Sequence, residues 1–201
     1  MLRSQSRSAQ IIRTSLHVRS LLCLAGLAVL TLPATAFCQL NSSTVGVNLN
    51  ATLTETLWIS VTPSNVNFTL VPGGSAVGSA PVVITTGWQL RPGHSTVLLD
   101  GYFSSTSAAL TDGGTPANNI PTSEVLGQMP TGELATYTAF TQTTGLGPAG
   151  AGLEFFSQKV TGANRNSSRT DNLNLEINLS SQPLLPPGVY TGTLTIQAQS
   201  N

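Results

Sequence analysis

Charged residues are scarce in this sequence. Only 8% of its 201 residues are Asp, Glu, Lys or Arg, against about 25% in ordinary soluble domains. The basic and acidic residues balance to a formal net charge of zero, whereas a nucleic-acid-binding protein needs a basic surface to neutralise phosphates. The composition therefore excludes a polyanion-binding protein. Because 40% of the residues are hydrophobic, it also excludes disorder driven by charge.

Cysteine is also scarce, and both cysteines, Cys23 and Cys38, lie near the N-terminus. Four arginines precede the first acidic residue, Glu55, and lead into the apolar run 21–32. A basic start followed by an apolar run of about 12 residues is typical of a secretory signal peptide and is too short to span a bilayer as a helix. We expect cleavage after Ala36 or, as the favoured site, after Cys38.

Two other kinds of leader fit this N-terminus less well than a signal peptide. An organellar transit peptide would be amphipathic rather than carry one compact apolar block. A lipoprotein signal would need a small residue before Cys38, where Phe37 stands. The sequence thus predicts a signal peptide at 1–38 and a single secreted, extracytoplasmic domain at 39–201, without a membrane span in its mature form.

The expected mature chain is acidic and has no cysteine. Four basic residues leave with the leader, and the remaining four basic and eight acidic residues give a charge of −4. With no cysteine after residue 38, a disulfide framework and a cysteine-based metal site are both excluded for this domain.

Apolar and polar residues alternate along most of the mature chain, and this period of two indicates strands that are buried on one face. Turn-forming Gly, Pro, Asn and Asp separate the runs, and a short helix is expected at most near 122–127. We predict an all-β, Ig-like antiparallel sandwich of about 7–9 strands. Besides the N-terminal run described next, the expected strands are 57–62, 66–70, 81–90, 96–103, 134–140, 153–160, 173–179 and 189–198.

The clearest alternation lies directly after the expected leader. Its apolar positions are Val45, Val47, Leu49, Ala51 and Leu53, each separated by one Gly, Asn or Thr. Such a run serves either as the first strand of a complete monomeric sandwich or as an edge strand that pairs with a neighbouring subunit.

Two segments carry a resemblance to a known group of proteins. Residues 188–196, GVYTGTLTI, resemble the closing strand of bacterial secreted Ig-like sandwiches, including spore coat protein U-like and chaperone–usher pilin-like subunits; residues 61–70 are similar to their early strands. The resemblance implies a structural subunit that exchanges strands with its neighbours, with residues 45–53 as donor strand. The chain departs from the pilins by lacking both their disulfide and the aromatic residue near the C-terminus, where residues 198–201 are AQSN.

Residues able to do chemistry are few. His94 is the only histidine after the leader; a hydrolase triad would combine it with Asp100 and one of many serines, and no pattern selects the serine. Gly145, Gly147 and Gly150 form a G-x-G-x-x-G without a βαβ unit around it, which indicates a loop rather than a nucleotide site. The acids are scattered singly, so we expect no enzyme activity, no catalytic residues, no cofactor and no metal.

Aromatic residues make up only 5% of the chain. A carbohydrate-binding module exposes some of them as a flat platform for sugar rings, and Trp58 and Trp88 are the candidates, although both have apolar neighbours that also suit a core position. We therefore predict a structural or adhesive protein that works with copies of itself or with surface-assembly proteins. A glycan-binding module is the alternative, and a secreted hydrolase using His94 is the weaker one.

Overall fold

The computed structural model describes residues 42–201. Both cysteines and the predicted leader lie outside the described residues, so the signal peptide stays a prediction. Residues 50–201 form one compact unit. The fold described below is that of the unit at 50–201.

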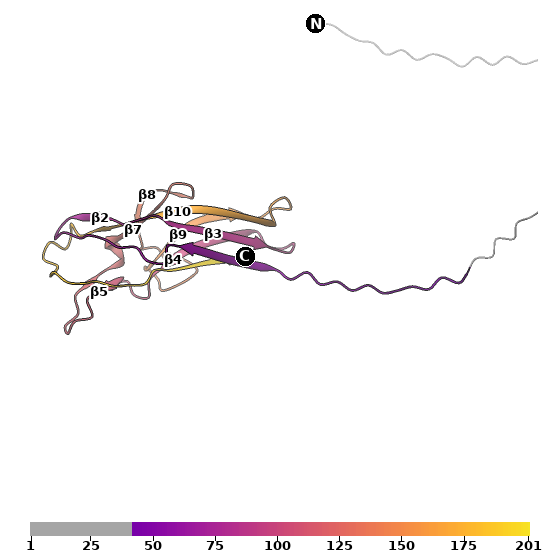
Figure 1. The fold of residues 1–201 in the computed structure, drawn as a ribbon, viewed down its shortest axis with the longest axis horizontal. Helices are drawn as coiled ribbons and strands as arrows, with labels where there is room; N and C mark the ends of the chain where they lie inside the picture. The colour runs from indigo at the N-terminus through magenta and orange to yellow at the C-terminus, as the bar shows by residue number, and fades with distance from the viewer. Residues whose placement is uncertain (1–41) are drawn as a thin grey trace, which may run out of the picture. The chain divides into compact units, whose positions relative to one another are not determined.

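One sheet has six strands. Its order is β1-β3-β10-β7-β8, and β2 also pairs with β10. All the pairings are antiparallel, and the long β10 runs along the body (Figure 1). The strands are β1 Thr56–Thr62, β2 Ser75–Val77, β3 Val82–Gln89, β7 Val125–Met129, β8 Leu134–Ala139 and β10 Asn166–Asn178.

A second, three-stranded sheet has the order β11-β4-β9, again antiparallel. Its strands are β4 Thr96–Tyr102, β9 Gly152–Lys159 and β11 Thr195–Ser200. A two-stranded pair, β5 Leu110–Thr111 and β6 Asn119–Ile120, and the 3-10 turn η1 Thr122–Glu124 complete the secondary structure of the described residues. The chain is all-β, as predicted.

The neighbour relations match an immunoglobulin-like sandwich. Such a domain has one sheet in the order A-B-E-D and a second sheet formed by C, F and G. Here β1-β3-β10-β7 corresponds to the first sheet, and β4 paired with β11 corresponds to C and F. Strand β9 lies on the other side of β4. In residues 42–201, no strand occupies the position of G, on the free side of β11.

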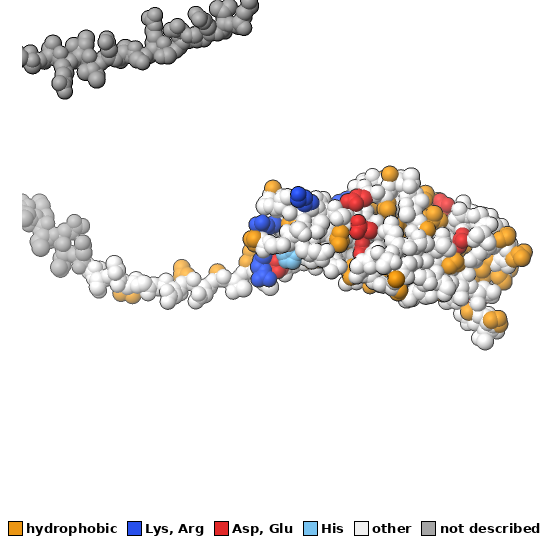
Figure 2. Space-filling view, turned by 180° about the vertical axis from the view of Figure 1, so that it is seen from behind, with side chains coloured by type: hydrophobic (Ala, Val, Ile, Leu, Met, Phe, Trp, Pro, Cys, Tyr) orange, Lys and Arg blue, Asp and Glu red, His pale blue; other side chains and the backbone are white. Residues whose placement is uncertain are grey.

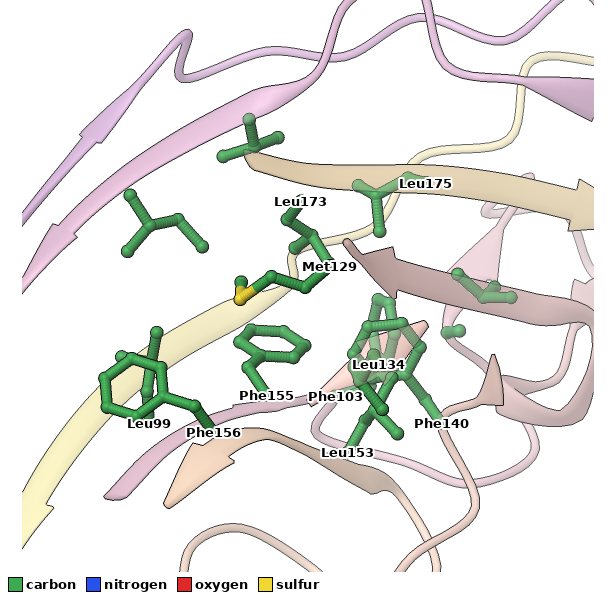
Figure 3. Close-up of a cluster of buried hydrophobic side chains, with 14 of the residues drawn as sticks. Leu99, Phe103, Met129, Leu134, Phe140, Leu153, Phe155, Phe156, Leu173 and Leu175 are labelled. Carbon is green, nitrogen blue, oxygen red and sulfur yellow. The ribbon is translucent and has the colours of Figure 1, made fainter. Parts of the chain in front are cut away.

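The core lies between the sheets and is built from the inward positions of both. Phe140, Phe155, Leu153 and Leu173 are fully buried, and Figure 3 shows them together with Met129. Phe140 meets Phe103 and Phe155 edge to face, with ring centroids 5.2 and 6.0 Å apart. Aromatic rings prefer this geometry because the positive edge of one ring faces the negative face of another.

Several expected strands need correction. Residues 45–53 and 66–70 form no strand, and the expected strand at 189–198 begins only at Thr195. Thr191 pairs instead with Thr111, each backbone N–H donating to the other residue's oxygen at 2.9 Å. The alternation does not predict β2, β5, β6 and β7, and residues 42–201 contain eleven strands instead of the predicted 7–9.

Candidate functional site

The alternating N-terminal run is the most unusual feature of the described chain. Residues 42–55 form no strand, and the side chains of Val45, Val47, Leu49 and Leu53 are 87%, 78%, 90% and 75% exposed. Isolated exposed hydrophobic residues are ordinary on protein surfaces, but here four exposed apolar residues alternate with polar ones within a single short segment.

Glu55 fixes the place where this run meets the sandwich. The backbone N–H of Arg91 donates to Glu55 Oε1 at 2.6 Å, and Arg91 Nη2 lies 2.9 Å from Oε2. The hydrogen bond from the Arg91 side chain is the first cause that lowers the pKa of Glu55. Figure 2 shows basic side chains and the histidine gathered at this end of the body. The run therefore starts from a fixed point beside the turn between β3 and β4.

Strand β11 has a free edge. It pairs with β4 on one side only, and β1, likewise paired on one side only, approaches it from the other sheet. An edge strand leaves every second backbone N–H and C=O without a strand partner. In Figure 1 the C-terminal end of β11 lies near the beginning of β1. Two edges thus meet where the seventh immunoglobulin strand would lie.

The apolar side chains at these edges are incompletely covered. Leu57 and Ile59 of β1, with Leu194, Ile196 and Ala198 at β11, pack against the core but are only partly buried. An added strand with apolar residues at every second position would cover them, because side chains two residues apart in a strand lie on the same face.

The two tryptophans differ in their surroundings. Trp88 is 4% exposed, and its Nε1 donates to the backbone oxygen of Asn164 at 2.8 Å. Its proposed place in a glycan platform is therefore wrong. Trp58 is 49% exposed and lies on the outer face of the six-stranded sheet. The alternation of Trp58 with the inward Leu57 and Ile59 was the signal that separates it from Trp88.

The described contact of the His94 side chain is with Glu55. Its Nε2 lies 3.1 Å from Glu55 Oε1, and its Nδ1 is buried without a partner. Within residues 42–201 no hydrogen bond joins His94 to Asp100 or to a serine. The arrangement needed for a hydrolase triad is not formed, because such a triad requires the base to contact its nucleophile.

The G-x-G-x-x-G segment is a loop, as expected, and it covers the outer face of the three-stranded sheet. A β-carbon at Gly147, which has φ +77°, would overlap the Tyr102 ring. Nearby, the backbone N–H of Glu154 donates to Gln142 Oε1 at 2.9 Å. The glycine lets the loop lie against the ring of Tyr102, so its role is packing.

Below this loop the register brings together two acids that the sequence had shown only as scattered. Asp100 on β4 lies opposite Glu154 on β9. Asp100 is 1% exposed and its Oδ1 has no hydrogen-bond partner. Burial, and next the negative charge of Glu154, raise the pKa of Asp100 to about 6, while a hydrogen bond from Thr144 opposes the shift.

Asp100→Asn is expected to stabilise the fold above pH 6. The folded state holds the Asp100 proton more tightly than the unfolded state, so the contribution of this proton is full below pH 3.8 and is lost as the pH rises through about 6. The uncharged amide avoids that loss, which amounts to about 3 kcal/mol at pH 8 for a pKa raised from 3.8 to about 6. Urea unfolding between pH 4 and 8 measures it, with Glu176→Gln as control. A stability difference that does not change with pH would contradict this assignment.

The remaining surface offers little chemistry. In residues 42–201 no group of three or more His, Cys, Asp or Glu could hold a metal ion. A depression of about 450 Å³ between residues 117–119 and 181–186 has no titratable side chain in its lining. Among the described residues, no helix has the length and apolar character needed to cross a membrane.

Comparison with known protein families, with curated proteins and with solved structures finds no match for this chain.

Proposed function

We propose that this chain is a structural subunit of an extracytoplasmic assembly, in which residues 45–53 of one copy pair with the free edge of β11 in the next copy. One observation carries the proposal. Within residues 42–201, an exposed, regularly alternating segment has no strand partner, and no strand covers the free side of β11.

The two surfaces suit each other chemically. The free edge of β11 offers backbone hydrogen bonds, and an added strand supplies the missing partners. In an added strand the five apolar residues of the segment would face one way and would cover Ile196, Ala198 and Ile59, which are partly buried. Burying each exposed Val or Leu contributes about 1.5–3 kcal/mol before the cost of association.

A neighbouring copy, rather than the same chain, is the donor. To lie beside its own β1 and β11, the segment would have to reverse within Thr54 and Glu55. These residues lack the Gly or Asn that tight hairpin turns require, and the Glu55 carboxylate is held by Arg91. Donation to another copy leaves this contact intact.

The predicted leader and the low charge of the chain both suit a subunit of an extracytoplasmic assembly. The predicted leader would carry the chain out of the cytoplasm, and a mature domain without cysteine can depend on its core and on neighbouring subunits for stability. Charged side chains are few on the face shown in Figure 2, and a low density of like charges leaves little repulsion to oppose contact between copies.

The test compares two faces of one segment. Protein expressed from the full, unaltered sequence is expected to give an SDS-resistant ladder in unheated samples. Val47→Asp with Leu49→Asp should abolish it, because each buried carboxylate costs several kcal/mol. Asn48→Asp with Asn50→Asp adds the same charge on the opposite side and should keep the ladder. No ladder from the unaltered chain, or equal ladders from both variants, would overturn the proposal.

A further inference from the structure

The indole of Trp58 lies across a neighbouring strand. Trp58 on β1 is opposite Gly87 on β3, and a β-carbon at Gly87 would overlap Cε2 and Cζ2 of the indole. The missing side chain lets one face of the ring rest on the backbone of β3. Because that face is covered and the residue is 49% exposed, the other face of the indole is open to solvent.

The surroundings of the ring are polar and uncharged. Gly87 is opposite Ser168 on β10, so Trp58, Gly87 and Ser168 form one row across the sheet. The neighbouring rows are Thr56, Gln89 and Asn166 on one side and Ser60, Thr85 and Thr170 on the other. Every polar side chain in these rows is a hydroxyl or an amide.

The rows are ordered, and a hollow lies beside the ring. The hydroxyls of Thr85 and Thr170 are 2.9 Å apart and hydrogen-bonded, which fixes two side chains of one row. A depression of about 310 Å³ lies beside Trp58, with Gln89, Asn166 and Ser168 in its lining. Arg91, the first basic residue after β3, is paired with Glu55.

This combination suits one class of ligand. A pyranose ring has an apolar face of C–H groups that packs on an aromatic ring, and hydroxyls at its rim that need donors and acceptors. Trp58 supplies the ring, while Gln89, Asn166 and Ser168 supply amide and hydroxyl groups at its border. The absence of charge in the three rows favours a neutral sugar over an acidic one.

We propose that the outer face of β1, β3 and β10 binds a sugar unit of a neutral polysaccharide, stacked on the exposed face of the Trp58 indole. This site is separate from the edge of β11 and does not rest on the proposed strand exchange. The protein would then attach to a glycan through one face while its edges serve assembly.

Affinity electrophoresis tests the site with protein expressed from the full sequence. The gels contain dextran, galactomannan, xylan or mixed-linkage β-glucan, and alginate is the acidic comparison. We expect at least one neutral polymer to retard the protein. Trp58→Ala should weaken this retention by about tenfold or more, and Trp58→Phe should restore part of it. Tyr137→Ala, which removes an aromatic ring from β8 at the other edge of the same sheet, should leave it unchanged.

Fluorescence separates binding from a general effect on folding. The chain has two tryptophans, and only Trp58 is exposed enough for acrylamide to reach it readily. Oligosaccharides of the retained polymer should therefore protect the unaltered chain from quenching, and Gly87→Ala, which displaces the indole, should abolish the protection. Failure of all four neutral polymers to retard the protein, retention by alginate alone, or retention unchanged in Trp58→Ala would overturn the proposal.

Discussion

Replacing Phe140 by Ala should lower the free energy of unfolding by about 3–5 kcal/mol. The ring is fully buried and fills the space beside two glycines, Gly101 on β4 and Gly127 on β7. A β-carbon at either glycine would lie within 3.2–3.3 Å of the Phe140 ring. The two glycines belong to different sheets, so Phe140 joins both, and its loss leaves a cavity that rigid strands close poorly.

Urea unfolding measures this effect, with Val77→Ala as the control. Val77 is 62% exposed, so its truncation should change stability by less than about 0.5 kcal/mol. If Phe140→Ala lowered stability by no more than the control, the ring would not join the two sheets, and the packing described here would be wrong.

Asp171→Ala should also lower the free energy of unfolding by about 3–5 kcal/mol, because it leaves the largely buried Arg169 without its counter-charge. Arg169 donates to both carboxylate oxygens of Asp171, at 2.7 and 2.8 Å. The Asp171 side chain is 3% exposed, and the hydroxyl of Thr131 also donates to it at 2.9 Å. The Arg169 guanidinium lies 4.0 Å above the Phe156 ring, which adds a cation–π contact.

The double replacement Arg169→Met with Asp171→Leu tests the cause of that loss. Removing both charges leaves no unpaired ion, so the double variant should be more stable than Asp171→Ala alone. Thermal unfolding of the three proteins compares them. A single variant within about 1 kcal/mol of the unaltered chain would show that the ion pair contributes little to the fold.

The alternation of polar and apolar residues predicted the all-β class and most of the long strands, because one-sided burial is written locally in the sequence. The alternation does not show whether a segment forms hydrogen bonds with a neighbouring strand. Val66, Phe68 and Leu70 alternate and pack against the core, yet they form no strand; the backbone of Asn67 bonds Ser79 instead. The run at 45–53 alternates equally well and has no partner among the described residues.

The contacts of the candidate sites depend on register, which a single sequence does not contain. Trp58 meets Gly87, and Asp100 meets Glu154, only after β1, β3, β4 and β9 are aligned. No local sequence pattern marks Gly87, so the sequence did not predict that the Trp58 indole lies over this glycine on β3. The face of the sheet that carries Trp58 was predictable from the sequence. Leu57 and Ile59 flank Trp58 and face inward, which places the indole outward.

The central claim is that residues 45–53 of one copy become a strand on β11 of another. Hydrogen–deuterium exchange, measured on the assembled protein and on the separated subunit, tests this most directly. We expect the backbone amides of residues 45–53 and of β11 to exchange slowly in the assembly, and those of 45–53 to exchange rapidly in the single subunit. Rapid exchange of residues 45–53 in both states would contradict it.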